Sequence, residues 1–454
     1  MLRVSARRVA VGLAGLLALG AAPLLPATHA GAAVADSIAS IDDKAKDVTK
    51  LSDGSAVDEP RADILTATAR AQNDFINLTM KLAKGDDLSA TKPEDYLRWG
   101  IGVQEGGPPA FVVDLKKGTN GFGQAVVAVP GNEATPEKCD GAIASFDAAN
   151  GLYLASVPAK CVGSPASVTW NAQRGVSIPG SSAGTTDVAR DFAPDAGPAK
   201  ALTPTAVVGY WAIGSDGKVY NFGDAPKLGD STSAGNSIID IEAAPHGIGY
   251  WTLDSKGTVS AFGPVLYGSL SASDLKTGEK AVSMSSSPTG AGYWVFTNKG
   301  RMFAFGDATK DMGDVSTLKL NGDIVDSSPT PTGKGYYLTA ADGGVFALGD
   351  AKFQGSTGNI KLNKPVVGIV PDPDGEGYWL VATDGGVFAF KAVFKGSTGE
   401  IKLNKPMRGM VPYGNGYLMV AEDGGVFNFS NKPFSGSTGD HPPANPMVSI
   451  TTLT

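Results

Sequence analysis

A short phrase built on glycine and tyrosine recurs six times in the second half of this chain. Its copies, most of them Gly-Tyr-Trp, begin 39 to 43 residues apart, at Gly209, Gly249, Gly292, Gly335, Gly377 and Gly416. A constant period of about 40–50 residues is typical of repeat architectures such as the β-propeller, in which each repeat is one supersecondary unit. The repeat therefore predicts a scaffold, and the function must be sought in the residues that the scaffold presents.

Each repeat reads as four short antiparallel strands, as the copy at residues 364–399 illustrates. Its first run is apolar on both faces, as expected of a buried strand. Its Asp384-Gly385 pair is typical of a tight hairpin turn, because glycine tolerates a positive φ. Four antiparallel strands in about 40 residues make one propeller blade. The strands expected in this copy are 366–370, 377–382, 386–390 and 393–397.

The order of the strands predicts how the ring closes. The second strand at Gly209 has almost no inner strand before it, whereas the last inner strand, 447–451, has no blade after it. We therefore expect an all-β chain in which residues 204–454 form a six-bladed β-propeller closed by the C-terminal strand, which leaves no open edge. The expected inner strands are 238–242, 281–285, 324–328, 366–370, 407–411 and 447–451.

The repeat phrase is similar to one found in a known group of proteins. The stretch from Gly377 to Phe390, Gly-Tyr-Trp-Leu-Val-Ala-Thr-Asp-Gly-Gly-Val-Phe-Ala-Phe, resembles a repeat of secreted actinobacterial proteins. In those proteins the repeat follows cell-wall amidases, peptidases or esterases as a non-catalytic module. The resemblance covers residues 205–454 and is strongest in the last three copies, since Lys256 and Lys299 replace the turn aspartate in earlier ones. It implies a fold and an exported protein, and it implies no activity.

Residues 1–30 have the composition of a secretory signal peptide. Three arginines within the first eight residues precede an apolar stretch, and Thr28-His29-Ala30 gives a small-x-small cleavage pattern. The alternative, a membrane anchor, is disfavoured by Gly20, Pro23 and Pro26. We expect an exported protein, extracellular or associated with the cell wall, with no membrane span after cleavage. The Sec and twin-arginine routes both stay open.

The formal net charge of −7 limits the classes of partner. An acidic exported protein lacks the basic surface with which proteins bind nucleic acid. The same charge disfavours attraction to an anionic lipid surface. We expect a monomer that contacts neither nucleic acid nor a membrane.

The first half predicts a second domain. Residues 57–174 carry short alternating segments typical of a β-sandwich, preceded by a charged segment at 31–56 that is either helical or without regular structure. Residues 175–203 are rich in Ser, Gly, Pro and Ala and predict a linker. The two cysteines, Cys139 and Cys161, favour one disulfide, because an even count outside the cytoplasm is typical of disulfide pairing.

Several phrases of this first domain also resemble a known type of domain. They are Ala62–Leu65, Gly151–Pro158, Cys161–Val168 and Asp191–Asp195, and together they resemble an all-β accessory domain of secreted actinobacterial proteins, similar to carbohydrate-binding or DOMON-like sandwiches. In such relatives an Asp-rich loop holds calcium. The corresponding stretch here, Val113–Lys117, lacks the extra carboxylates, so we expect no metal site and no cofactor.

The candidate binding surface lies in the loops between blades. The aromatic residues of the repeat are expected in the core, because each strand of a propeller blade packs on its neighbours on both faces. A Lys- and Asn-containing loop recurs before two inner strands and could bind acidic or polyhydroxy ligands, although a purely solvated rim is the simpler interpretation. Its candidate residues are Lys361, Asn363, Lys364, Lys402, Asn404 and Lys405.

These observations predict a secreted binding or scaffold protein of the cell envelope, with no catalytic centre of its own. Its expected partners are cell-wall polysaccharide or another exported protein. The alternative is an extracellular carbohydrate-active enzyme, a glycosidase or lyase, with carboxylates in the propeller channel. Such an enzyme needs two carboxylates about 5–10 Å apart, and the acidic residues of the inner strands are Asp240, Glu242, Asp323 and Asp326.

Overall fold

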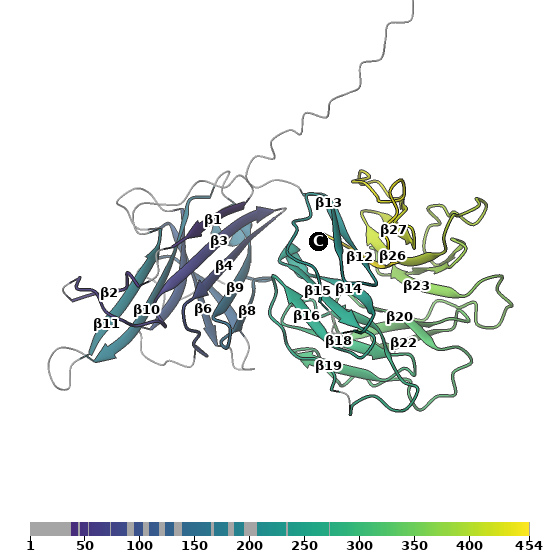
Figure 1. Ribbon diagram of the computed structural model, residues 1–454, viewed down its shortest axis with the longest axis horizontal. Coiled ribbons are helices and arrows are strands. Elements are labelled where there is room, and N and C mark those ends of the chain that lie inside the picture. Colours follow the sequence, from purple (N-terminus) through teal and green to yellow (C-terminus); the bar gives the residue numbers. More distant parts are fainter. Residues whose placement is uncertain are drawn as a thin grey trace, which may run out of the picture. The chain divides into compact units, whose positions relative to one another are not determined.

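A computed structural model describes most of the chain after residue 37. It describes residues 38–43, 46–52, 54–72, 74–88, 95–102, 109–117, 123–130, 139–164, 168–179, 186–194, 207–232, 235–271 and 273–453. Within these ranges the regular structure consists of strands, apart from two 3-10 turns, η1 (Ala159–Val162) and η2 (Pro245–Gly247), so the predicted all-β class is confirmed (Figure 1). The predicted signal peptide at 1–30 lies outside the described residues.

The first eleven strands form two antiparallel sheets. The strands are β1 (Ile38–Asp42), β2 (Thr49–Lys50), β3 (Ile64–Gln72), β4 (Phe75–Leu82), β5 (Tyr96–Ile101), β6 (Phe111–Lys117), β7 (Gly123–Ala128), β8 (Ile143–Asp147), β9 (Leu152–Pro158), β10 (Trp170–Pro179) and β11 (Thr186–Ala193). One sheet has the order β1-β3-β4-β9-β8 and the other β2-β11-β10-β5-β6-β7. Both sheets contribute to a single apolar core, in which Leu78 and Tyr153 of the first sheet join Trp99 and Trp170 of the second.

The N-terminal boundaries differ from the sequence prediction in two places. The expected linker at 175–203 contains the end of β10 and all of β11, which pair with each other from Ala172↔Ala193 to Pro179↔Thr186. The charged segment at 31–56 contains the strands β1 and β2, and no helix among its described residues. In β11 the core contacts are made by small residues, Val188, Ala189 and Ala193, whose alternation is easily hidden in a Ser-, Gly- and Ala-rich composition.

The predicted disulfide is confirmed. Cys139 and Cys161 are bonded, with their Cα atoms 5.6 Å apart. Both half-buried cysteines pack against the core that the two sheets share. The bond thereby ties the turn before β8 to η1, which follows β9.

The remaining strands form six three-stranded antiparallel sheets among the described residues (teal through yellow in Figure 1). In sheet order they are β13 (Val219–Gly223), β12 (Gly209–Gly214) and β29 (Met447–Thr452); β14 (Ile238–Ala244), β15 (Gly249–Asp254) and β16 (Val259–Phe262); β17 (Ala281–Ser286), β18 (Gly292–Thr297) and β19 (Met302–Gly306); β20 (Ile324–Pro329), β21 (Gly335–Ala340) and β22 (Val345–Gly349); β23 (Val366–Pro371), β24 (Tyr378–Ala382) and β25 (Val387–Phe390); β26 (Met407–Tyr413), β27 (Gly416–Ala421) and β28 (Val426–Phe429).

The last strand of the chain pairs with the first strand of this region. β29 lies antiparallel to β12, with Tyr210 opposite Thr452 and Ala212 opposite Ile450. We call β14, β17, β20, β23, β26 and β29 the inner strands, because each contacts the next in that order and β29 contacts β14. Every inner strand has a bulge at its second residue, where the register with its partner shifts by one.

The tyrosines and tryptophans of the repeat are buried, as predicted from the sequence. The expected fourth strand, 393–397, is not a ladder strand; side chains hold this outer segment instead. Trp379 donates its indole N–H to the carbonyl of Val393 in the outer segment of its own sheet, at 3.0 Å. The tyrosine of the next sheet, Tyr417, donates its hydroxyl to the carbonyl of Gly396, at 2.6 Å.

The tyrosine contact recurs around all six sheets. Its hydroxyl-to-carbonyl distances lie between 2.5 and 2.6 Å, and the pairs are Tyr250–Gly229, Tyr293–Gly268, Tyr336–Gly313, Tyr378–Gly355, Tyr417–Gly396 and Tyr210–Gly436. Five of these pairs join consecutive sheets. The sixth pair joins Tyr210 of the first sheet to Gly436, in the segment that follows β28. The same contact therefore links consecutive sheets and also links the first sheet to the last.

We expect the substitution Gly396→Ala to destabilise the protein. Gly396 has a φ of +132°, and an added Cβ would lie 2.5 Å from Cδ1 of Phe429. Backbone strain of about 1–2 kcal/mol and overpacking of about 1–3 kcal/mol should lower the free energy of unfolding together. The control is Gly375→Ala, where φ is +74° and nothing lies within 4 Å of the added Cβ. Denaturant unfolding should show the larger loss for Gly396→Ala, and equal losses would contradict the packing explanation.

Candidate functional site

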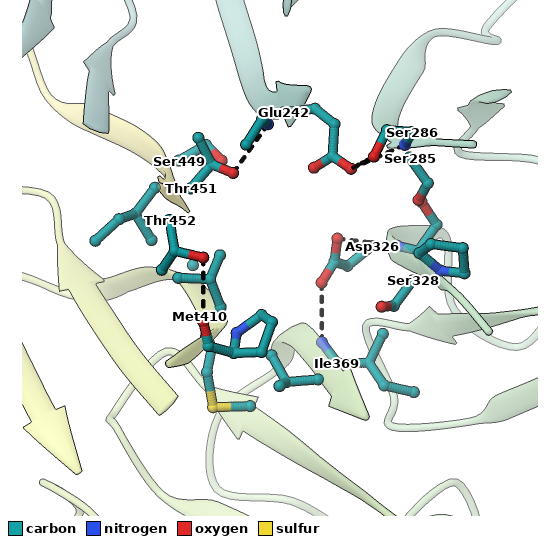
Figure 2. A pocket seen from close by; sticks show the side chains of 18 of the residues that line it. Glu242, Ser285, Ser286, Asp326, Ser328, Ile369, Met410, Ser449, Thr451 and Thr452 are labelled. Atoms are coloured by element: carbon teal, nitrogen blue, oxygen red, sulfur yellow. Dashed lines mark hydrogen bonds between the residues drawn. The ribbon is translucent and has the colours of Figure 1, made fainter. Parts of the chain in front are cut away.

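A cavity of about 640 Å³ lies between the inner strands. Residues from all six inner strands line it, and Figure 2 shows the carboxyl groups of Glu242 and Asp326 pointing into it. Each inner strand pairs with a partner on one side only, so its other edge presents backbone N–H and C=O groups to this space. These backbone groups therefore need hydrogen-bond partners within the cavity.

The third residue of each inner strand forms a partly polar belt around the cavity. Ser449 donates its hydroxyl to Asp240 Oδ1 at 2.7 Å, and the backbone N–H of Met284 donates to Asp240 Oδ2 at 2.9 Å. The pattern repeats two sheets later, where Ser283 and the N–H of Ile369 donate to the two oxygens of Asp326. The six residues of the belt are Asp240, Ser283, Asp326, Gly368, Gly409 and Ser449.

Glu242 lies two residues further along β14 and is bound less completely. Its Oε1 accepts hydrogen bonds from the backbone N–H and the hydroxyl of Ser286, at 2.8 and 2.9 Å. Its Oε2 has no hydrogen-bond partner among the described residues. Of the three acids that line the cavity from the inner strands, Glu242 alone keeps an oxygen available to a ligand.

Enclosure in the protein raises the pKa of all three carboxyl groups. Removal from bulk water, which penalises the charged form, is the main cause and raises the pKa to about 6 for Asp240, about 7 for Asp326 and about 8 for Glu242. Hydrogen bonds from neighbouring strands lower each pKa in part, while repulsion from Asp240 raises the pKa of Asp326 and Glu242 further. At neutral pH Asp240 is therefore mostly ionised and Glu242 mostly protonated.

Asp323, the fourth acid considered from the sequence, lies elsewhere. It is exposed just before β20, where its carboxylate accepts a hydrogen bond from Asn298 at 3.0 Å and pairs with Lys299 at 2.6 Å. These two partners lower its pKa. The structure thus brings together Asp240, Glu242 and Asp326, and it separates Asp323 from them.

The serines of β17 are site residues that the sequence analysis missed. Ser283 and Ser285 each lie 2.8 Å from the hydroxyl of Ser327 in the next inner strand, and Ser286 holds Glu242. Aligning the inner strands by position would have revealed Ser283 and Ser285, because the third and fifth residues of β14, β17 and β20 all carry a hydroxyl or carboxyl group. Their shared role is to link β17 to its two neighbouring inner strands, β14 and β20.

The predicted binding loops lie outside the cavity. The segments before β23 and β26 carry the six candidate residues, all exposed and none hydrogen-bonded or ion-paired within the described part of the chain: Lys361, Asn363, Lys364, Lys402, Asn404 and Lys405. Beside them, Ile360 and Ile401 are 56% and 55% exposed. Each loop therefore presents an apolar side chain next to two ammonium groups and an amide.

One group of carboxylates has a geometry that could hold a cation. Asp47, Asp63 and Asp191 each place one oxygen within 4.8 Å of the other two. Backbone N–H groups already bind two of them, since Lys46 donates to Asp63 and Ile64 donates to Asp191. Burial raises the pKa of Asp191 to about 7, so protonation supplies another way to relieve the repulsion.

Comparisons with known proteins give only distant likenesses. No protein-family model and no curated protein match the chain. A solved structure described as a nidogen/laminin complex contains a chain with 10% identity and a TM-score of 0.39, covering 54% of this chain and 98% of that one. The β-propeller domain of Cps50 (Swd1) from Myceliophteria thermophila has 11% identity and a TM-score of 0.34, covering 52% of this chain and 86% of that one. Likenesses this distant carry no argument about function.

No helix in the described ranges has the length and the apolar character needed to cross a membrane.

Proposed function

We propose that residues 209–453 form a six-bladed β-propeller closed by its C-terminal strand, and that the two N-terminal sheets form a β-sandwich. The pairing of β29 with β12, the contact of β29 with β14, and the hydrogen bond from Tyr210 to Gly436 support the closure. The core that both N-terminal sheets share supports the sandwich.

On this frame the protein acts as a secreted, non-catalytic binding or scaffold protein of the cell envelope, and its ligand is cell-wall glycan. The observation that carries the proposal is the repeated loop with exposed Ile360 and Ile401, whose lysine and asparagine side chains are all unengaged. Ammonium and amide groups donate hydrogen bonds to hydroxyl and carboxylate oxygens. Isoleucine can cover the C–H face of a sugar ring, and the two copies of the loop, one before β23 and one before β26, suit a ligand that itself repeats. Another exported protein is the competing partner.

A second candidate function is a glycosidase or lyase that uses the cavity carboxylates. The different pKa values of Asp240 and Glu242 favour it, because an acid and a base in one site need such a separation. The hydrogen bonds that occupy both oxygens of Asp240 and of Asp326 weigh against it. If the wild type releases nitrophenol from aryl glycosides and Glu242→Gln does not, the protein is a glycosidase and the binding function is wrong.

Pull-down on insoluble peptidoglycan tests the binding function. We expect alanine at the six loop residues Lys361, Asn363, Lys364, Lys402, Asn404 and Lys405 to lower retention at least about tenfold, because several hydrogen bonds of about 1 kcal/mol each are lost. The control carries alanine at four exposed lysines outside these loops, Lys116, Lys160, Lys227 and Lys310. Equal retention of the two variants would contradict the proposal that the loops bind glycan. If the protein instead binds another exported protein and not peptidoglycan, that protein is the ligand.

A further inference from the structure

The two sides of the cavity differ in polarity. The side formed by β14, β17 and β20 carries carboxyl and hydroxyl groups, those of Asp240, Glu242, Ser286, Asp326 and Ser328. The side formed by β23 and β26 is mainly apolar, with Val367, Ile369, Val370, Gly409 and Val411, and the guanidinium of its Arg408 is paired with Glu422. A cavity of this size is in the range that holds small ligands, about 300–1,000 Å³. Its occupant must offer polar atoms to one side and an apolar surface to the other.

The carboxyl group of Glu242 determines which kind of polar group a ligand must place beside it. With Oε1 engaged by Ser286, the unengaged Oε2 is the atom that faces the open space in Figure 2. A protonated carboxyl group donates a hydrogen bond from this position, so the matching group is an acceptor such as a hydroxyl, ether or carbonyl oxygen. Asp240 and Asp326 already accept bonds on both oxygens, which leaves them less able to ligate a cation.

A charged occupant fits the cavity less well than a neutral one. An anion would face three carboxyl groups, while the guanidinium of Arg408 is already paired with Glu422 and the ammonium of Lys432 lies over the Tyr413 ring. A cation would lose its hydration against the valine side and would gain in return only carboxylates that the neighbouring strands already bind. A neutral molecule with hydroxyl groups on one edge meets neither cost.

We propose that this cavity binds a small uncharged hydroxylated molecule, the size of a monosaccharide, whose oxygen accepts a hydrogen bond from Glu242 and whose apolar face packs on Val367 and Val411. This site is separate from the loop surface. Alanine at the six loop residues leaves it intact, so the two proposals can fail independently.

Three ligands that share one sugar ring test the proposal on the full-length protein. Methyl β-D-glucopyranoside is neutral, its 6-deoxy-6-trimethylammonio derivative is a cation at every pH used, and glucuronate is an anion. In titration calorimetry at pH 7.5 we expect the neutral glycoside to bind at least about tenfold more tightly than the other two. Glu242→Gln should hold the glycoside within about threefold, since its amide can accept from Ser286 and donate to the ligand. Glu242→Ala should lose about tenfold, the value of one hydrogen bond.

The pH dependence separates a ligand contact from a structural role of Glu242. Between pH 7.5 and 9.5 the wild type should lose affinity as Glu242 loses its proton, whereas Glu242→Gln should not. The other titratable groups lining the cavity are Asp240, Asp326, His246, Asp372, Arg408, Tyr413 and Lys432. Burial lowers the pKa of His246 to about 4 and raises the pKa of Tyr413 above its ordinary value. The pKa values of Asp240 and Asp326 lie below this window, and Arg408 is paired with Glu422.

Three results would overturn the proposal. They are tighter binding of the trimethylammonio derivative with rising pH, an unchanged affinity in Glu242→Ala, and no binding of the glycoside at millimolar concentration. If Glu242→Ala does not fold, the comparison of the wild type with Glu242→Gln across the pH range still decides between the outcomes.

Discussion

Deletion of residues 447–454 is expected to abolish the cooperative unfolding transition of the second half of the protein. The deletion removes β29, so β12 loses its partner and β14 and β26 lose a neighbour. Met447, Ile450 and Leu453 are buried, and each buried side chain of this size contributes about 2–3 kcal/mol. The sum is comparable with the whole stability of a domain, about 5–15 kcal/mol.

Tryptophan fluorescence and limited proteolysis of the truncated chain measure this effect. The matched control is Ile450→Val, which keeps the strand and should lose only about 1 kcal/mol. A synthetic peptide of residues 441–454, added in trans, should restore the transition, because its strand can pair again with β12. A truncated chain that unfolds at the same denaturant concentration as the wild type would show that β29 does not close the ring.

The sequence predicted the strands of the repeat well because their signals are local. Periodic Gly-Tyr-Trp phrases, hairpin turns such as Asp384-Gly385 and apolar inner runs all act within a few residues of one another. The offset between first and last strands predicted the pairing of β29 with β12, although that pairing joins residues such as Tyr210 and Thr452 from opposite ends of the region. Repetition supplied the long-range information that a single strand lacks.

The features that could not be predicted depend on contacts between repeats. The sequence predicts a fourth strand at 393–397, yet the hydroxyl of Tyr417 and the indole of Trp379 hold this outer segment in place of a ladder. The predicted linker at 175–203 contains β11, whose buried apolar residues are small. Only the structure separates Asp323 from Asp240, Glu242 and Asp326, because Asp323 lies before β20 and pairs with Lys299 outside the cavity.

The carboxyl groups of the cavity also make stability depend on pH in an unusual direction. Ordinary carboxyl groups titrate near pH 4, whereas the pKa is raised to about 6 for Asp240, about 7 for Asp326 and about 8 for Glu242. Between these values the folded protein holds protons that the unfolded chain has released. The free energy of unfolding therefore falls as pH rises from about 4.5 to 8, by at most about 1.4 kcal/mol per pH unit for each such proton.

We expect Glu242→Gln to flatten this fall between pH 6 and 8, where Glu242 is the last of the three to lose its proton. Urea unfolding followed by tryptophan fluorescence, at half-unit intervals of pH, gives the slope directly. Glu400→Gln removes the same charge from an exposed position and should leave the slope unchanged. Asp191, whose pKa is raised to about 7 in the N-terminal sheets, contributes equally to all three proteins and cancels in the comparison. If Glu242→Gln has the same slope as the wild type, or if stability rises with pH, these acids are ionised in the folded state. A cavity lined by ionised carboxylates would then no longer favour a neutral ligand.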